Sequence, residues 1–408
     1  MGSVNLDNTG SGSAITLSSD GTSLLLDGTA IGGGGGAALE LYAENPSSPT
    51  APTATGTNAV AIGFNADATN THSIAIGHNT VASAKYSIAL GRSATASGNN
   101  AAALGWQANA SGIQSVALGN AATSSGTDSI AFGLGASASN TGGAAFGKGA
   151  TTAGSNYNVA IGNSYTSGAD AFAAAISTNS SSYGASGSGS VAMMNWAKAS
   201  GSNSGAIGFG ANATGSFAHA FGAQSFATAS SSLALGKQCQ ATANYATSIG
   251  RGAINPIKGS FKFSGSYFSA AGDSQIGMYP LQIDTSDATP AVLVTDENST
   301  PGAGTTNQVV LPNNSAYSFT GTIVARQKAG DGTASAAWKV EGLIRREANA
   351  GTTVLVASTV TALSNAPSWG MALTADTTNG CLKIEATGAA SINIRWVATI
   401  NTSEVLYA

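Results

Sequence analysis

The sequence predicts an all-β protein: a long parallel β-roll or solenoid built from 14-residue repeats, followed by a C-terminal antiparallel β-sandwich of jelly-roll type. Three observations predict this fold class. Glycine recurs at a constant 14-residue interval through the middle of the chain. The residues before each glycine alternate between apolar and small. Beyond residue 254, short strand-like runs alternate with turn residues. Together these patterns predict a repetitive shaft and a separate β-rich tip.

The repeat is defined by its glycines. They recur with a 14-residue spacing at Gly63, Gly77, Gly91, Gly105, Gly119, Gly133 and Gly147, and Gly162 follows one position later than this spacing requires. Two degenerate repeats then carry Ala175 and Met194 in the glycine position, and the 14-residue spacing returns at Gly208, Gly222, Gly236 and Gly250. A fixed period over this length is the signature of a solenoid.

Each repeat holds a short strand of the form apolar-Ala-apolar-Gly, as in Ile74-Ala75-Ile76-Gly77. Alternation with a period of two gives the strand two different faces. A 14-residue coil has room for two short strands and two bends, where Gly and Asn relieve the cost of positive φ. Stacking fourteen such coils at about 4.8 Å predicts a rod of roughly 65 Å.

Such a coil is too thin to bury both faces of its strands, so lateral partners are expected. Three-fold association is a natural solution, because it buries one face of every coil against its neighbours. We favour a coil filled by the Val/Ile/Leu/Phe row with the Ala row facing a partner, although the pattern also permits the reverse arrangement.

Composition narrows the possible functions. The net charge is −4 and only 8% of residues are charged, so no basic stripe exists to bind nucleic acid. No apolar run is long enough to span a membrane. Cys239 and Cys381 lie in segments of different character and are expected to be buried free thiols. Because residues 1–7 lack the basic and apolar regions of a secretion signal, we expect assembly in a host cytoplasm.

The repeats carry a family resemblance. Asn58-Ala59-Val60-Ala61-Ile62-Gly63 and Gln114-Ser115-Val116-Ala117-Leu118-Gly119 resemble the head repeats of YadA-type trimeric adhesins. This resemblance implies a left-handed parallel β-roll that assembles as a homotrimer, and it covers residues 57–253. The sequence departs from the family between Ser177 and Ser190, where extra Ser and Gly residues predict a bulging loop.

Residues 1–56 form an expected attachment segment and linker. Two strand-like runs within Ile15–Leu26 surround Ser-Ser-Asp-Gly and predict a hairpin or a further coil. The glycines of 32–36 and three prolines up to Pro52 then predict an extended connection to the first coil. This segment resembles N-terminal parts of structural proteins from marine and cyanobacterial phages. The segment is expected either to dock to other tail proteins, directly or through an adaptor, or to act as a simple tether.

Residues 254–408 divide into an expected connector, 254–300, and a C-terminal β-sandwich, 301–408. About eight short strands with turns between them are typical of an antiparallel sandwich. The strands are expected at Ser260–Ser269, Ala291–Thr295, Gln308–Leu311, Ser318–Lys328, Ala336–Arg346, Thr353–Thr361, Leu382–Ala386 and Asn393–Thr399. Runs such as Ala337-Trp338-Lys339-Val340-Glu341-Gly342 resemble the C-terminal domain of phage tail-fibre proteins, which implies a receptor-binding tip.

The sequence contains no pattern that predicts catalysis, a cofactor or a metal site. Glycoside hydrolysis generally needs two neighbouring carboxylates. The shaft offers Asp67, Asp128 and Asp170, which are several coils apart, and the acids of the tip lie beside turns. No nucleophile elbow or zinc-ligand spacing is present. The chain is therefore not expected to be an enzyme.

Recognition residues are harder to predict. Asp331, Arg345, Arg346 and Trp369 are candidates for receptor contact because loops and rims carry recognition. Trp338, Trp369 and Trp396 are nevertheless expected in the core of the tip, with stacking on a sugar as the alternative. In the shaft, the position after each glycine varies freely, as in Phe64 and Trp106. This predicts a solvated corner row, and a ligand-binding stripe is the alternative.

Our interpretation is a homotrimeric phage tail fibre. It would belong to the virion tail and bind a host-surface receptor, a glycan or an outer-membrane component, through its distal C-terminal domain. The host is expected among bacteria, including cyanobacterial or marine species. A fragment of a cellular trimeric adhesin is the first alternative, and a polysaccharide-degrading tailspike is the second.

Overall fold

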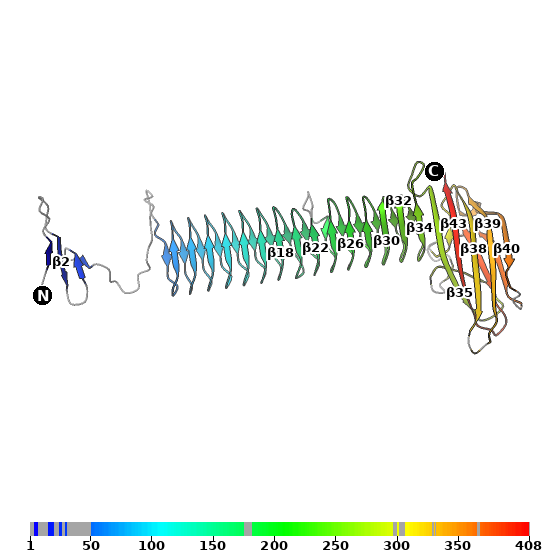
Figure 1. Ribbon diagram of the computed structural model, residues 1–408, viewed down its shortest axis with the longest axis horizontal. Helices are drawn as coiled ribbons and strands as arrows, with labels where there is room; N and C mark the ends of the chain where they lie inside the picture. Colours follow the sequence, from blue (N-terminus) through cyan, green and yellow to red (C-terminus); the bar gives the residue numbers. More distant parts are fainter. Residues whose placement is uncertain are drawn as a thin grey trace.

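The computed structural model describes residues 50–174, 182–296, 300–301, 307–328, 330, 332–364 and 368–407, and the backbone of four strands before residue 31. The predicted linker glycines, Ala175 and Asp331 lie outside these residues. The described chain is all-β, as predicted, apart from one 3-10 turn, η2 (Ala350–Thr352). A parallel shaft leads into an antiparallel domain at one end, which we call the tip (Figure 1).

The four N-terminal strands form a small antiparallel sheet in the order β1-β2-β3-β4. They are β1 (Val4–Leu6), β2 (Ile15–Ser19), β3 (Leu24–Leu26) and β4 (Thr29–Ala30). Strands β2 and β3 pair antiparallel, with Leu17 opposite Leu26. Of the two possibilities left by the sequence, this segment adopts the hairpin.

The shaft consists of two parallel sheets, and each coil contributes one strand to each sheet. We call the sheet whose strands have three or more residues the long-strand sheet. It contains β6 (Val60–Ile62), β8 (Ile74–Ile76), β10 (Ile88–Leu90), β12 (Ala102–Leu104), β14 (Val116–Leu118), β16 (Ile130–Phe132), β18 (Ala144–Phe146), β20 (Val159–Ile161), β22 (Phe172–Ala174), β24 (Val191–Met193), β26 (Gly205–Ile207), β28 (His219–Phe221), β30 (Leu233–Lys237), β32 (Thr247–Arg251) and β34 (Phe261–Ser264).

The other sheet, which we call the short-strand sheet, is 15-stranded. It contains β5 (Thr53–Ala54), β7 (Asp67–Ala68), β9 (Val81–Ala82), β11 (Thr95–Ala96), β13 (Asn109–Ala110), β15 (Thr123–Ser124), β17 (Ser137–Ala138), β19 (Thr151–Thr152), β21 (Tyr165–Thr166), β23 (Gly184–Ala185), β25 (Lys198–Ala199), β27 (Asn212–Ala213), β29 (Phe226–Ala227), β31 (Gln240–Ala241) and β33 (Ile254–Asn255).

The register repeats the sequence period. Ala103 lies beside Ala117, and Leu104 beside Leu118, so like residues stack along the shaft. The ladder continues beyond residue 253 into β34, where Ser264 occupies the glycine position. A glycine is not needed there because the next strand is antiparallel, and no further coil stacks upon it.

The repeat glycine is required by both conformation and space. Gly119 has φ +134°, and a Cβ built on it would lie 2.5 Å from the carbonyl oxygen of Gly133 in the next coil. Two residues later, the chain adopts positive φ at residues such as Asn65 and Gln107, in addition to glycine. Tight stacking, together with positive φ, therefore fixes the 14-residue spacing.

Buried serines close the second bend of many coils. The hydroxyls of Ser87, Ser115 and Ser129 each donate a hydrogen bond of 2.7 Å to the carbonyl three residues earlier. This contact satisfies polar groups inside a coil whose interior is mostly alanine.

The tip begins as a continuation of the long-strand sheet. Strand β34 pairs antiparallel with β35 (Ser274–Thr285), and the sheet then proceeds through β43 (Ile394–Leu406), β38 (Ser315–Gln327), β39 (Ser335–Arg346) and β40 (Val354–Ala362). A second sheet has β42 (Cys381–Thr387) at its centre, flanked by β36 (Ala291–Val292) and β37 (Val309–Val310) on one edge and β41 (Gly370–Asp376) on the other. The antiparallel character of the tip is as predicted.

Two strands of the tip were not expected, namely β35 and β41. Pro280 lies inside β35, and Gly277 interrupts its apolar alternation, so the sequence pattern is that of a connector. The structure accommodates Pro280 because β34 pairs only with Ile276, Gly277 and Met278, so no strand requires a backbone N–H donor from residue 280.

Three tryptophans form the centre of the tip, as expected. Trp396 is fully buried, with Trp338 stacked at 5.4 Å and Trp369 tilted at 5.9 Å between ring centroids. Its indole N–H donates a hydrogen bond of 2.9 Å to the Thr285 hydroxyl. The core between the two sheets therefore depends on β39, β43 and the segment that precedes β41.

Candidate functional site

The interior of the shaft is filled by alanine. Ala89, Ala103 and Ala117, at the centres of successive strands, are fully buried, and the facing alanines of the short-strand sheet are buried as well. Our preference for an interior of Val, Ile, Leu and Phe was wrong. The bends between the two strands span only four or five residues, such as 63–66 and 69–73, and hold the sheets too close for larger side chains.

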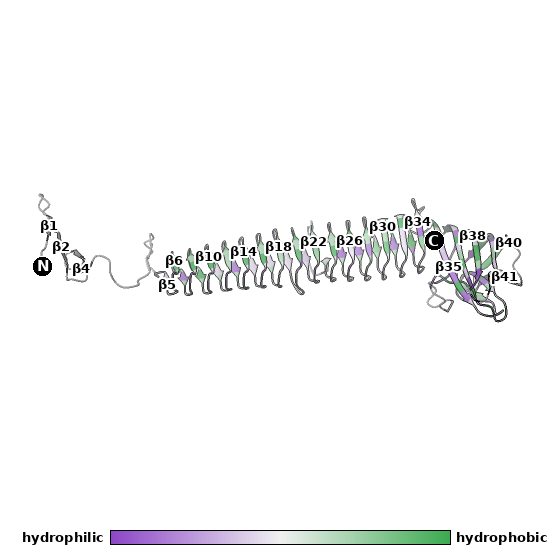
Figure 2. Ribbon diagram, turned by 60° about the horizontal axis from the view of Figure 1, so that its bottom comes forward, coloured by the Kyte–Doolittle hydropathy of each residue, from purple (hydrophilic) through white to green (hydrophobic). Residues whose placement is uncertain are grey.

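The larger apolar residues instead point outward from the long-strand sheet. Their exposed fractions in a single chain reach 49% at Phe132 and 42% at Ile161. One column is apolar at every coil: Ile62, Ile76, Leu90, Leu104, Leu118, Phe132, Phe146, Ile161, Ala174, Met193, Ile207, Phe221, Leu235, Ile249 and Phe263. A parallel column, from Val60 to Phe261, is mostly apolar. We call the two columns the apolar face (Figure 2).

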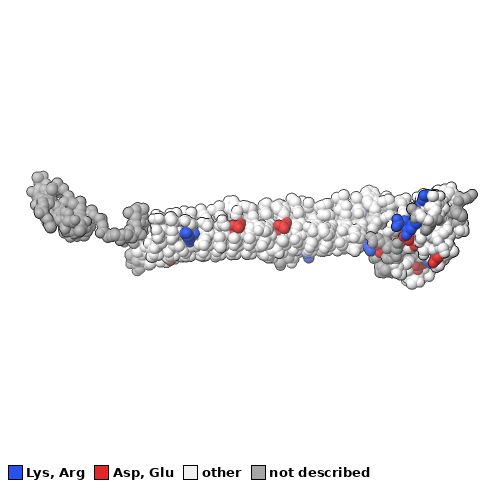
Figure 3. All heavy atoms as spheres, turned by 90° about the horizontal axis from the view of Figure 1, so that it is seen from below, with Lys and Arg blue, Asp and Glu red and all other residues white. Residues whose placement is uncertain are grey.

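The outer face of the short-strand sheet has the opposite character. Its outward positions are mainly Thr, Asn, Ser and other polar residues, such as Thr95, Asn109 and Thr123. Most charged residues of 57–253 lie on this sheet or at the bends: Asp67, Lys85, Arg92, Asp128, Lys148, Asp170 and Lys198. Lys237 and Arg251 are the last residues of β30 and β32, beyond the two apolar columns. Figure 3 shows how sparse these charges are along the shaft. No charged residue of the described coils occupies the apolar face.

The predicted receptor residues differ in accessibility. Arg345 is exposed at the end of β39 and pairs with Glu347 at 2.8 Å. Arg346 is half-buried and donates a hydrogen bond of 2.6 Å to the carbonyl of Leu311. Trp369 is 8% exposed and belongs to the core. The two arginines are therefore adjacent in sequence but lie in different surroundings.

Arg346 lines a cavity of about 320 Å³ where the shaft meets the tip. The wall is mostly apolar, with contributions from Ile257, Leu311 and Tyr317, while Lys262 and Gln275 add polar groups. The Nε of Arg346 is buried and has no hydrogen-bond partner among the described residues. Arg345 does not line this cavity: with Glu347 and Tyr407 it lines a separate, more open hollow of about 570 Å³.

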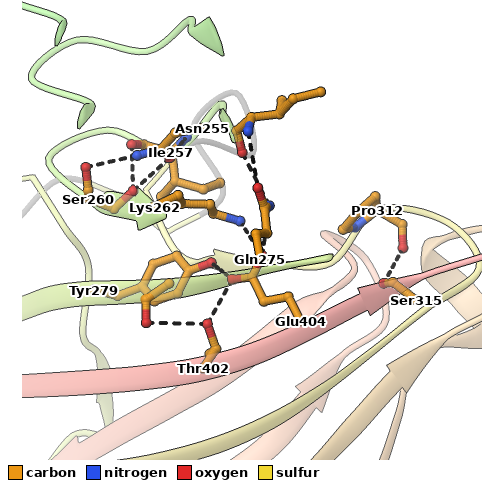
Figure 4. A network of polar contacts seen from close by, with 12 residues as sticks. Asn255, Ile257, Ser260, Lys262, Gln275, Tyr279, Pro312, Ser315, Thr402 and Glu404 are labelled. Atoms are coloured by element: carbon orange, nitrogen blue, oxygen red, sulfur yellow. Dashed lines mark hydrogen bonds and ion pairs between the residues drawn. The ribbon is translucent and has the colours of Figure 1, made fainter. Parts of the chain in front are cut away.

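A buried ion pair joins the last coil to the tip (Figure 4). Lys262 of β34 and Glu404 of β43 are each 2% exposed, and Nζ lies 2.7 Å from Oε2. Tyr279 and Thr402 donate hydrogen bonds to Oε1 at 2.6 and 2.7 Å, and Gln275 donates to Oε2 at 2.9 Å. The carboxylate thus receives enough donors to remain ionised in the interior.

The network shifts the pKa of its members. Burial alone would raise the pKa of the Glu404 carboxyl, but the Lys262 ammonium and the hydrogen bonds from Lys262, Tyr279 and Thr402 hold it below its usual value. Burial, and then the Glu404 charge, raise the pKa of the Tyr279 phenol well above its usual value. The sequence contained one signal of this site, since Lys262 takes the inward strand position that Ala234 and Ser248 hold in the two preceding coils.

No catalytic constellation is found among the described residues. Asp67, Asp128 and Asp170 belong to separate coils. In the tip, Asp284 lies near Lys328 and Arg395, and Glu341 pairs with Lys339. The described ranges contain no group of three or more His, Cys, Asp or Glu placed to bind a metal.

Two further findings concern the cysteines and the question of a membrane-spanning helix. Cys239 and Cys381 are both buried and free, as expected, and burial raises the pKa of each thiol. Within the part of the chain that the structure describes, no helix is both long and apolar enough to cross a bilayer.

The fold and its outer faces define a β-roll repeat protein. The repeat matches the family described as the YadA head domain repeat, over residues 54–80, 82–108, 110–136, 213–238 and 227–253. The shaft is therefore a YadA-like β-roll. The matched segments leave out residues 137–212, which include the degenerate repeats.

Among solved structures, two tailspikes show weak similarity. The first is gp49 of Acinetobacter baumannii bacteriophage Fri1, a capsular polysaccharide depolymerase, with 7% identity, a TM-score of 0.21, and coverage of 85% of this chain and 69% of that one. The second is the tailspike of Acinetobacter baumannii phage AM24, with 9% identity, a TM-score of 0.20, and coverage of 84% and 62%. These scores support no argument about activity. No curated protein matches the sequence.

Proposed function

We propose that three copies of this chain form a phage tail fibre that binds a bacterial surface receptor through the C-terminal domain, without catalysing a reaction. The apolar face carries the proposal. A single chain leaves this face in water over the whole length of the shaft, whereas the opposite face is polar. Exposed apolar surface of this extent is typical of an interface.

Association of three chains accounts for the two straight columns of the apolar face. An axis parallel to the shaft brings the same column of like residues together coil by coil, and a closed three-fold ring covers the apolar face of every copy. The YadA-like repeats favour the same assembly. In this arrangement the polar short-strand sheet of each chain faces solvent.

The tip is the proposed receptor-binding end. It closes the shaft with a rigid sandwich, and the buried Lys262–Glu404 pair holds the two parts in one orientation. The exposed Arg345–Glu347 pair and the hollow that it lines with Val405 and Tyr407 present both signs of charge beside apolar surface. Residues 1–56 would attach the fibre to the virion tail, and assembly would take place in the host cytoplasm.

The test uses the full-length protein. Light scattering at micromolar concentration should give the mass of three chains, and the labelled fibre should adsorb to a subset of strains in a panel of marine and cyanobacterial bacteria. Arg345→Glu should weaken adsorption without changing the mass, whereas Ser137→Asp on the polar face of the shaft should change neither. A monomeric mass, or equal adsorption by the Arg345 variant and the control, would count against the proposal.

Catalysis is tested on the same trimer. Incubation with host envelope polysaccharide should release no oligosaccharide. Release of fragments by the purified fibre would favour a tailspike instead.

A further inference from the structure

An aromatic groove interrupts the polar side of the shaft. Its rings come from successive coils and are Tyr183, Trp196, Phe209 and Phe226. The Trp196 and Phe209 rings lie 4.8 Å apart, tilted by 49°, and are 43% and 41% exposed. The hollow between these side chains has a volume of about 240 Å³.

The position of this groove separates it from the apolar face. Phe226 is an outward residue of the short-strand sheet, and Trp196 and Phe209 lie at the bends that lead into the same sheet. Most other outward positions of this sheet are polar. The groove also borders the region where the repeat loses its regular spacing, between Gly162 and Gly208. A local departure from the repeat that gathers aromatic side chains indicates a function beyond stacking of the coils.

The polar residues of the groove indicate the chemistry of its ligand. Asn212 and Gln224 supply amide groups between the rings, and Lys198 supplies a cation. The Asn212 Oδ1 is buried without a hydrogen-bond partner among the described residues. Lys198 has no carboxylate within ion-pair distance in the described part of the chain. Ring faces stack on the C–H faces of sugars, amides bond their hydroxyl groups, and an ammonium pairs with an acidic sugar.

We propose that this groove binds an acidic saccharide segment of a bacterial surface polysaccharide. The hollow is smaller than the roughly 300–1,000 Å³ of sites that enclose a whole small molecule. It therefore suits one part of a polymer that continues along the shaft. The amides would fix the hydroxyl pattern, and Lys198 would select a unit that carries a carboxylate.

This site is independent of the receptor site proposed for the tip. If the chain is trimeric, each fibre presents three copies of the groove, and a repeating polymer can engage more than one of them. Weak individual contacts then give useful avidity. The groove would hold the fibre along the polysaccharide layer while the tip reaches its own receptor.

The experiment applies the full-length fibre to an array of bacterial polysaccharide fragments, acidic and neutral. Wild-type protein should bind acidic fragments. Trp196→Ala should reduce this binding by up to about tenfold, because one ring contact is worth at most about 1.4 kcal/mol. Trp196→Phe should restore most of the binding. Lys198→Gln should remove the preference for acidic over neutral fragments.

Trp106→Ala is the matched control. Trp106 is 50% exposed at a bend of the shaft but does not line the groove, so its loss should leave binding unchanged. Light scattering and the melting temperature should be the same for both alanine variants. Failure of the wild-type fibre to bind any fragment, or equal losses at Trp106 and Trp196, would refute the proposal. A change of mass in Trp196→Ala alone would overturn it as well, by assigning the groove to subunit contact. Adsorption to cells is measured separately with Arg345→Glu, so the proposal for the tip and the proposal for the groove can be refuted independently.

Discussion

The substitution Phe132→Asp is expected to prevent association of the shaft. Phe132 lies on the apolar face of β16 and is 49% exposed in a single chain. Ser137 of β17 lies on the same coil but on the polar face, and it provides the matched control. The two variants add the same charge to opposite sides of one coil.

The magnitude follows from burial and charge. Full burial of a Phe side chain is worth about 1.5–3 kcal/mol, so the exposed half contributes roughly 1 kcal/mol per chain and roughly 3 kcal/mol per trimer. An aspartate in the same place adds a desolvation cost of several kcal/mol for each of three charges. With about 3 kcal/mol for each aspartate the total is about 12 kcal/mol per trimer, which corresponds to a loss of about nine factors of ten in the association constant.

Sedimentation velocity between about 0.1 and 10 μM measures this effect directly. Wild type and Ser137→Asp should sediment as trimers throughout, and Phe132→Asp as a monomer. Retention of the trimer by Phe132→Asp, or its loss in both variants, would refute the assignment of the apolar face as the interface.

Three further substitutions test the packing. Ala117→Leu should destabilise the shaft by about 1–3 kcal/mol, measured by chemical unfolding, because the coil interior has no space for added methylenes. Gly119→Ala should destabilise it by about 1–3 kcal/mol in the same assay, because a Cβ there meets the Gly133 carbonyl at positive φ. Glu404→Gln should cost about 3–5 kcal/mol in the tip, followed by tryptophan fluorescence, because it leaves Lys262 buried without a carboxylate. The pKa of Glu404 is lower in the folded protein than in the unfolded chain. The ionised carboxylate therefore stabilises the fold at pH values above the ordinary glutamate pKa of about 4.3, and this stabilisation is lost as the pH falls through the folded pKa. Glu404→Gln should remove this part of the pH dependence of unfolding.

Each of these substitutions has a control nearby. Thr123→Val changes an outward residue on the polar face of the same coil as Ala117 and should change stability little. Gly135→Asn changes a residue that has φ +63° and no atom within 4 Å of the added Cβ, a backbone conformation that Asn tolerates. Glu341→Gln removes an exposed pair and should cost less than about 1 kcal/mol. Equal effects in a variant and its control would contradict the packing argument.

The repeat and the class of fold could be predicted because the 14-residue period is a property of the sequence itself. Which face of each strand points into the coil could not be predicted. In Val116-Ala117-Leu118, alternation shows that two faces differ, but only the distance between the two sheets decides that the alanine methyl is the one that fits inside.

The contacts at the end of the shaft were less predictable still. Lys262 and Glu404 are separated by 142 residues, and no local pattern links them. Arg346 was expected on a rim, but its side chain bonds to the Leu311 carbonyl and forms one part of a cavity wall. Such sites arise from the meeting of distant segments, which a single sequence does not encode locally.

The placement of β43 has a consequence for synthesis. This strand lies between β35 and β38, yet it leaves the ribosome after every other described strand. Until it arrives, β35 and β38 present open hydrogen-bonding edges, and Lys262 has no counter-ion. A nascent chain interrupted before residue 394 would therefore carry a paired shaft and two open strand edges that favour aggregation, and only the synthesis of β43 closes them.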